Sequence, residues 1–418
     1  MTDILLIGSK EKTESVKLDE LARLAIDGLG LVPGQELVVT APVEAIALVR
    51  KIAGHAYKAG ASIVTPIFTD DENIRSRFRY ALDESFDRSP GWLFQGMATA
   101  FRSGAARLAI VGEDPTLLQS EDPNKVARAN RSRSESYRAI RELTSGFFMN
   151  WTIVPCATLG WAKAVFPNDP DQIAMGKLWD VIFFITRVQQ SDPVTAWSKH
   201  MKGLQARASA LNQKRYTSLH FRGPGTDLQV GLADDHTWNG GFARAKNGTI
   251  CCANIPSEEI FTAPHKNRVE GYVSSTKPLP YHGTLIEDIS ICFANGEAVR
   301  SEARVGDELL KRIMSIDSGS CRLGEVALVP YSSPISQTGL LFYNTLLDEN
   351  AASHIALGQG FAKSISGGDD LPGEELEAKG LNQSLIHLDC MIGSSEVDVD
   401  GLTSTGTSEP VMRHGEWV

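Results

Sequence analysis

Long apolar runs are missing from this sequence. Nowhere do about 18 apolar residues follow one another without interruption, although a helix that crosses a membrane needs roughly that length. Basic residues are also in deficit, because 41 Lys and Arg stand against 51 Asp and Glu and give a formal net charge of −10 near pH 7. Proteins that bind phosphate backbones usually carry the opposite sign. The sequence therefore predicts no membrane association and no nucleic-acid partner.

Cysteine is scarce, and the cysteines show no paired spacing. None of the six cysteines forms a CxxC pair, which favours reduced thiols over a disulfide framework or a thiolate zinc site. Residues 1–7 lack the basic segment that begins a secretory signal peptide. Together these observations predict a cytoplasmic protein.

The 418 residues are enough for two domains, and the patterning differs between the halves. In the first half, helical stripes alternate with short apolar runs that are typical of buried strands. This alternation predicts a doubly wound parallel sheet. The helices are expected at 18–29, 43–60, 124–143 and 193–213, and the strands at 36–40, 61–68, 108–112 and 181–186.

After residue 214, short strand-like runs are separated by turn-rich pieces. The stretch 304–316 is the one persuasive helix of this half, since its apolar residues recur at helical spacing. The predicted fold is thus an N-terminal α/β domain over 1–200, followed over 201–418 by a mainly antiparallel, β-rich domain.

Acidic residues and a histidine stand in apolar surroundings in the second half. Glu258 and Glu259 are adjacent, so in an extended chain one of them faces inward, whereas a solvated acidic turn would leave both outside. Glu325 begins an apolar strand, where a surface carboxylate is the ordinary interpretation. His354 precedes the apolar run Ile-Ala-Leu, and by itself is explained equally well as a hydrogen-bonded, partly buried histidine.

His387 and Asp389 give a clearer signal. They are two residues apart in an otherwise apolar strand, so both side chains point to one face. Burying an unpaired carboxylate is costly, so this strand requires a cation, a metal ion or a hydrogen bond between the two side chains. Two histidines and three carboxylates exceed what one catalytic zinc needs and suit two divalent ions that share a carboxylate. This candidate ligand set is Glu259, Glu325, His354, His387 and Asp389.

Five segments closely resemble the M29 family of metallo-aminopeptidases, the aminopeptidase T and aminopeptidase S group. The resemblance spans nearly the whole chain, and the motifs stand in the family's order. It implies an N-terminal α/β domain, a C-terminal β-rich domain with two metal ions, and a homodimer that encloses the active sites. The segments are 254–265 (NIPSEEIFTAPH), 323–330 (LGEVALVP), 346–358 (LLDENAASHIALG), 387–393 (HLDCMIG) and 395–401 (SEVDVDG).

The resemblance also implies roles for individual residues. The family's metal ligands fall on the five residues of the candidate set, and a further acid of the motif falls on Glu349. The implied reaction removes the N-terminal residue of short peptides with a metal-activated water. Zinc is the default ion, and cobalt or manganese suits the same ligands. Glu349 or Glu258 would act as general acid and base.

One position departs from the family pattern. A tyrosine regarded as catalytic usually follows the histidine of the ENAASH segment by seven residues, but this sequence has Phe361 there. Loss of one oxyanion donor costs about 10²–10³ in rate. Either another group donates, with Gln359 and Ser364 as local candidates, or the enzyme is slow on ordinary peptides, or its substrate differs.

Two other functions remain open at this point. His354, His387 and Asp389 also match the two-histidine, one-carboxylate set of mononuclear iron oxygenases, and M29-like chains include ring-cleaving dihydroxypyridine dioxygenases. Glu259 and Glu325 weigh against that function, because a mononuclear site would not need them. A non-catalytic assembly protein with a decayed site is supported only by Phe361. The metallo-aminopeptidase is the leading prediction.

Overall fold

The computed structural model describes residues 13–281 and 284–418. The prediction drawn from residues 1–7 lies outside them. The chain divides into two compact units, of which the second comprises Met201–Gly241 and Pro256–Val418. The first contains the residues up to 200 and also the segment Phe242–Ile255. The chain therefore passes back into the first unit after residue 241, which a single boundary at residue 200 does not describe. Assignment of these regions as separate domains stays a prediction.

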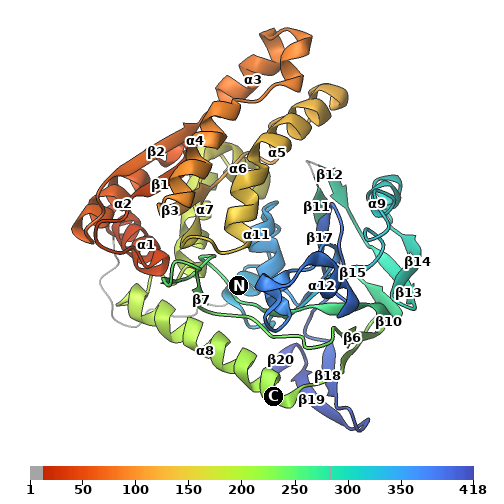
Figure 1. Ribbon diagram of the computed structural model, residues 1–418. Coiled ribbons are helices and arrows are strands. Elements are labelled where there is room, and N and C mark those ends of the chain that lie inside the picture. Colours follow the sequence, from red (N-terminus) through yellow and green to blue (C-terminus); the bar gives the residue numbers. More distant parts are fainter. Residues whose placement is uncertain (1–12, 282–283) are drawn as a thin grey trace. The chain divides into compact units, whose positions relative to one another are not determined.

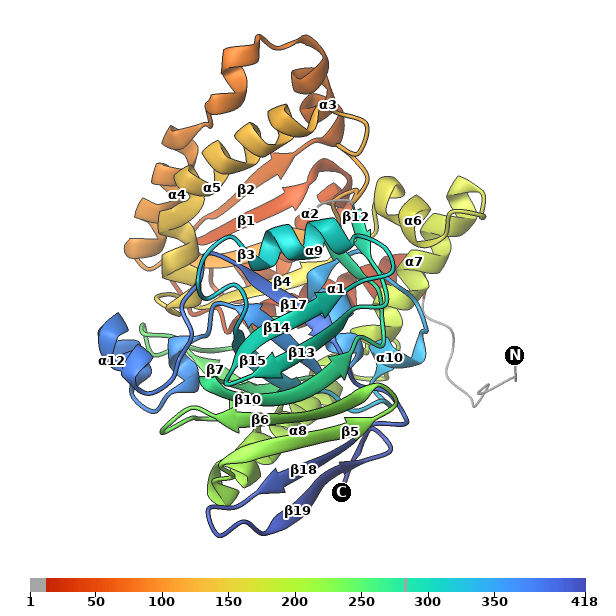
Figure 2. The same ribbon diagram turned by 90° about the vertical axis from the view of Figure 1, so that its right-hand side faces the viewer.

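The first unit is built on a parallel sheet with the strand order β2-β1-β3-β4. Figure 1 labels β1, β2 and β3, and Figure 2 shows all four strands in this order. Val38 packs against helices α4 (Gly91–Arg102) and α5 (Pro123–Ser145), and its neighbour Val39 is fully buried. Coverage of both faces explains why strand β1 is apolar without alternation. The strands are β1 (Leu37–Pro42), β2 (Val64–Thr69), β3 (Ala106–Val111) and β4 (Trp151–Pro155), with the short pair β7 (Ala243–Arg244) and β8 (Ile250–Cys251) in a separate ladder.

The helices of the first unit connect these strands. One predicted strand, 181–186, is wrong, because it forms the end of helix α7. Leu178, Ile182 and Ile185 are fully buried there at helical spacing, and a short apolar run does not by itself distinguish a buried helix from a buried strand. The helices are α1 (Glu14–Leu29), α2 (Ile46–Lys58), α3 (Asp71–Tyr80), α4 (Gly91–Arg102), α5 (Pro123–Ser145), α6 (Leu159–Val165) and α7 (Asp171–Ile185). Helix α8 (Pro193–Lys214) includes the division between the units.

The second unit contains a large antiparallel sheet with the order β14-β13-β10-β6-β5-β18-β19-β20. In Figure 2, strands β14, β13, β10, β6, β5, β18 and β19 lie side by side in this order. Turns between sequence neighbours, such as β5 to β6 at Gly223 to Thr226, explain the turn-rich texture of this half. Its strands are β5 (Ser218–Gly223), β6 (Thr226–Leu232), β10 (Pro264–Ser274), β13 (Ser290–Ala294), β14 (Glu297–Glu302), β18 (Asp398–Leu402), β19 (Ser408–Arg413) and β20 (Glu416–Trp417).

A smaller antiparallel sheet in the same unit has the order β17-β16-β15-β9. Its strands are β9 (Ile260–Thr262), β15 (Leu323–Leu328), β16 (His354–Gly358) and β17 (His387–Met391), and the hairpin of β11 (Leu279–Tyr281) and β12 (Thr284–Ile286) stands beside it. The helices are α9 (Asp307–Met314), α10 (Pro334–Gln337), α11 (Thr345–Asp348) and α12 (Gly373–Ala378). The predicted fold class, a parallel α/β region followed by antiparallel β structure, is confirmed.

Two further features bear on the predictions. Among residues 13–281 and 284–418, no helix combines the length and the apolar character that crossing a membrane requires. All six cysteines are free thiols.

Candidate metal centre

The small antiparallel sheet gathers the predicted ligands on one face. Glu325, Ala356 and Asp389 lie directly opposite one another on β15, β16 and β17, and cross-strand partners point to the same side. His354 and His387 are each two residues from this row along their own strands, so alternation places them on the same face. Glu259 immediately precedes β9 and stands two residues before Phe261, the partner of Ala327.

A bulge in β15 sets the position of Glu325. The register shifts by one residue between Leu323 and Glu325, which leaves Gly324 unpaired and directs Leu323 into the core on the opposite side. A Cβ atom at Gly324 would stand 2.3 Å from the carbonyl oxygen of Gly358. Glycine is therefore needed for the two backbones to approach at this point.

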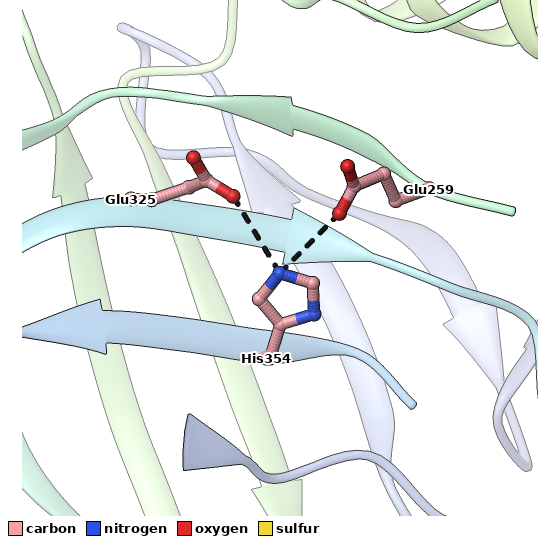
Figure 3. A group of neighbouring side chains, drawn as sticks. All are labelled: Glu259, Glu325 and His354. Carbon is pink, nitrogen blue, oxygen red and sulfur yellow. Dashed lines mark ion pairs between the residues drawn. The ribbon is translucent and has the colours of Figure 1, made fainter. Parts of the chain in front are cut away.

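The first group of ligand atoms comprises Glu259, Glu325 and His354 (Figure 3). Nε2 of His354 is 3.4 Å from Oε2 of Glu259 and 3.5 Å from Oε1 of Glu325. All three residues are buried, and the residue accessibility of His354 is 0%. These ligand atoms converge on a buried position.

The second group comprises Glu325, His387 and Asp389, so Glu325 belongs to both groups. Nε2 of His387 is 3.2 Å from Oδ1 of Asp389. The side chain of His387 is 26% exposed, whereas that of Asp389 is 6% exposed. Within each group, one ligand atom per residue lies within 4.8 Å of the others. The second position is therefore the more open one.

Hydrogen bonding leaves the facing atoms available for a metal ion. Nδ1 of His354 is 3.1 Å from the carbonyl oxygen of Ala352, and Nδ1 of His387 is 2.8 Å from that of Gln359. A protonated Nδ1 donates to the carbonyl and leaves the Nε2 lone pair for coordination. Oε2 of Glu259, Nε2 of His354 and Oδ1 of Asp389 are buried and have no hydrogen-bond partner among residues 13–281 and 284–418. Buried nitrogen and oxygen atoms without hydrogen-bond partners are suitable ligand atoms for divalent ions.

The electrostatics of the site also favour a bound divalent ion. Burial opposes charge on His354, but its contact with Glu325 and the nearby Glu259 and Asp389 outweigh burial and raise its pKa to about 10. Burial likewise opposes charge on His387, whose pKa Asp389 and Glu325 raise to about 10. Without another cation, the clustered carboxylates draw protons onto both imidazoles. A divalent ion supplies that positive charge and displaces the protons.

A cavity of about 250 Å³ opens beside the second group and includes Glu349 in its wall. Burial and the carboxylates of Glu259 and Asp389 raise the pKa of Glu349 well above its ordinary value. A carboxyl group with a raised pKa beside the ligands can give and take a proton. The cavity is lined by Leu279, Pro280, Tyr281, Thr345, Asp348, Glu349, His387, Leu388, Asp389 and Met391.

Glu258 is placed differently from its neighbour. Glu258 is buried, and its backbone N–H donates to Oδ1 of Asn350 at 2.7 Å. It belongs to neither group of potential ligands and does not line the cavity. Of the two adjacent glutamates, the structure brings Glu259 into the cluster.

Phe361 lies at the edge of the cluster, with its ring centroid 5.0 Å from that of His387 and 6.1 Å from that of Phe261. The Lys363 ammonium group stands over both phenylalanine rings. Gln359 accepts a hydrogen bond from the Ser384 N–H and donates to the Gly360 carbonyl. The buried hydroxyl of Ser364 is 3.4 Å from Nδ2 of Asn239. The Gln359 side chain is thus bonded to the backbone, the Ser364 hydroxyl accepts from Asn239, and neither residue lines the cavity.

The wall that β11 contributes to the cavity was not predicted from the sequence. Only three residues form this strand, too few for a periodic signal. The sequence pattern therefore does not predict that Tyr281 lies beside His387.

The cluster of buried acids and histidines on the small sheet defines a candidate site for divalent metal ions. The sequence model of the thermophilic metalloproteases, M29, matches residues 14–417. The chain belongs to the M29 family, as predicted.

The relatives agree with this assignment. Aminopeptidase T of Thermus thermophilus is 50% identical over 402 residues, which cover 96% of this chain and 98% of the relative. Its wild-type structure superposes with a TM-score of 0.92, covering 96% of this chain and 99% of that one at 49% identity. Aminopeptidase AmpS of Bacillus subtilis is 41% identical over 96% of this chain and 98% of its own length. The prediction of a metallo-aminopeptidase is confirmed.

A more distant structure bears on the alternative function. The 2,5-dihydroxypyridine dioxygenase of Pseudomonas putida KT2440 is similar over 97% of this chain and 98% of its own, with a TM-score of 0.52 and 12% identity. At that identity, the likeness extends to the fold and not to the reaction.

Proposed function

We propose that this protein removes the N-terminal residue of short peptides at a site for two divalent ions. The observation that carries the proposal is the sharing of Glu325 between two groups of ligand atoms. A carboxylate common to two groups is what a bridged pair of ions requires. The proposed ligands are Glu259, Glu325 and His354 for the enclosed position, and Glu325, His387 and Asp389 for the open one.

When bound, the ions would polarise the scissile carbonyl and lower the pKa of a water toward 7. Glu349 would accept the proton of that water and pass it to the leaving amine. Its place in the cavity wall and its raised pKa support this role. Glu258 has weaker support, because it does not line the cavity.

The cavity also accounts for a preference for free N-termini. Asp348, Glu349 and Asp389 line it together with apolar residues. An α-ammonium group would donate hydrogen bonds to carboxyl oxygens of this wall, whereas an acylated terminus would bring no ammonium group to them. The apolar wall would contact the first side chain of the peptide.

Metal content provides the direct test. Elemental analysis of the purified protein should find about two zinc, cobalt or manganese ions per chain, as a shared-carboxylate site requires. The same preparation should hydrolyse leucine p-nitroanilide and spare its N-acetylated form. One iron per chain, with no peptide hydrolysis and with dioxygen consumption on a dihydroxypyridine, would instead identify the oxygenase.

A homodimer in the cytoplasm completes the proposal. Free thiols throughout the chain support a reducing compartment. Sedimentation equilibrium should give about twice the chain mass of 45.4 kDa. A monomer of full activity would exclude a dimer that encloses the sites.

Phe361 offers a gain-of-function prediction. Its ring contacts His387, so the hydroxyl introduced by Phe361→Tyr would reach the polar side of the cluster rather than the core. An added oxyanion donor should raise kcat by about tenfold, equal to about 1.4 kcal/mol of transition-state stabilisation. Steady-state kinetics on a leucyl peptide measures this, and an unchanged kcat would show that position 361 does not face the scissile carbonyl.

A further inference from the structure

The cavity beside His387 has a wall that the mechanism above does not use. Strand β11 contacts β17, the strand that carries His387 and Asp389. Leu279 and Tyr281 of β11 both line the cavity. They are two residues apart and share a face of the hairpin, and Leu279 is 6% exposed on that side. Tyr281 therefore brings a phenol group to the space that Glu349, His387 and Asp389 also border.

Peptide hydrolysis requires a hydrogen-bond donor near the scissile carbonyl. As the water oxygen bonds to the carbonyl carbon, the electron pair of the C=O π bond moves to the carbonyl oxygen, which becomes an oxyanion. A donor placed there stabilises the transition state more than the substrate. Phe361 has no hydroxyl, the Gln359 side chain is bonded to the backbone, and Gln359 and Ser364 both lie outside the cavity lining.

Among the described residues of the cavity wall, two carry hydroxyl groups, Tyr281 and Thr345. Thr345 begins α11, on the side of Glu349, and has a short side chain. Tyr281 has the longer reach and approaches from beside β17. Its phenol, with an ordinary pKa near 10, keeps its proton at neutral pH, and burial raises the pKa of Tyr281 further.

We infer that Tyr281 is a catalytic residue whose phenol O–H donates a hydrogen bond to the oxyanion of the scissile carbonyl. The inference rests on the proposed aminopeptidase function. The phenol keeps its proton throughout the reaction. When the C–N bond breaks, its electron pair leaves with the amine, which receives the proton held by Glu349, and the oxyanion re-forms the C=O double bond.

The variant Tyr281→Phe tests this role by removing one oxygen atom. On leucine p-nitroanilide, kcat should fall by about 10²-fold, with KM within about threefold of wild type. Metal content should not change. Calorimetry should show a comparable loss of affinity for a phosphinic dipeptide that mimics the tetrahedral transition state, and no loss for free leucine. Tyr272→Phe is the matched control, because Tyr272 lies on β10 with 48% exposure and outside the cavity.

The outcomes separate this inference from the proposed function. A wild-type enzyme that hydrolyses peptides, paired with a Tyr281→Phe enzyme of equal kcat and equal affinity for the phosphinic ligand, would overturn the role of Tyr281 alone. A loss seen in Thr345→Ala instead would assign the donor to Thr345. A metal-loaded wild type without any peptidase activity would overturn the proposed function itself.

Discussion

Replacement of Glu325 by glutamine is expected to abolish both metal binding and peptide hydrolysis. Glu325 contributes to both groups of ligand atoms, and a neutral amide does not replace a bridging carboxylate. Activity should fall by about 10³-fold or more, equivalent to at least about 4 kcal/mol of transition-state stabilisation. Elemental analysis and steady-state kinetics on leucine p-nitroanilide measure the two losses.

The fold should survive this substitution. Glutamine has nearly the size of glutamate, and the strand is anchored by Leu323, Val326 and Leu328, all fully buried. Circular dichroism would check this. Glu297→Gln serves as the control, because it removes an exposed carboxylate paired with Arg322, a contact worth at most about 1 kcal/mol. If the Glu325→Gln protein kept two ions per chain, the shared-ligand assignment would be wrong.

Replacement of Glu349 by glutamine is expected to separate chemistry from metal binding. Glu349 lines the cavity but belongs to neither group of ligand atoms. Loss of a general acid and base costs about 10²–10⁴ in rate, so kcat should fall by that factor while two ions per chain remain. A second signature is expected in the pH profile of kcat, which should lose the limb that reports this carboxyl group.

The variant Asp348→Asn, at the neighbouring position, is an informative comparison for Glu349→Gln. The Asp348 carboxylate accepts hydrogen bonds from the backbone N–H groups of Phe342 and Asn344, so its loss should lower stability, whereas the limb of the pH profile assigned to Glu349 should remain. If Glu349→Gln lost its metal ions together with its activity, Glu349 would be a ligand rather than a proton carrier.

The sequence allowed much of this site to be predicted, because its signals are local. His387 and Asp389 alternate with apolar neighbours within one strand, so their common face follows from the spacing alone. The assignment of α7 failed for a related reason. Its last residues are uniformly apolar, and no polar residue among them marks the period.

What was not predictable depends on contacts between distant segments. The pairing of β15 with β16 and of β16 with β17 brings Glu325 opposite Asp389 across Ala356, and nothing local to Glu325 encodes that neighbour. The same holds for the Gln359 carbonyl that orients His387, and for the cavity wall from β11. Non-local strand pairing is decided by the packing of the whole unit.

The bulge at Gly324 has a consequence for how the gene can change. Strand β17 follows a two-residue repeat, so the loss or gain of one codon between His387 and Asp389 would turn one of the two side chains away from the cluster. Such a change would remove a ligand from the site even if the sheet still paired. In β15, the extra residue at Gly324 already compensates one such offset. Insertions and deletions should therefore be tolerated in the connecting loops and excluded from these strands, a pattern of length variation that substitution analysis alone would not reveal.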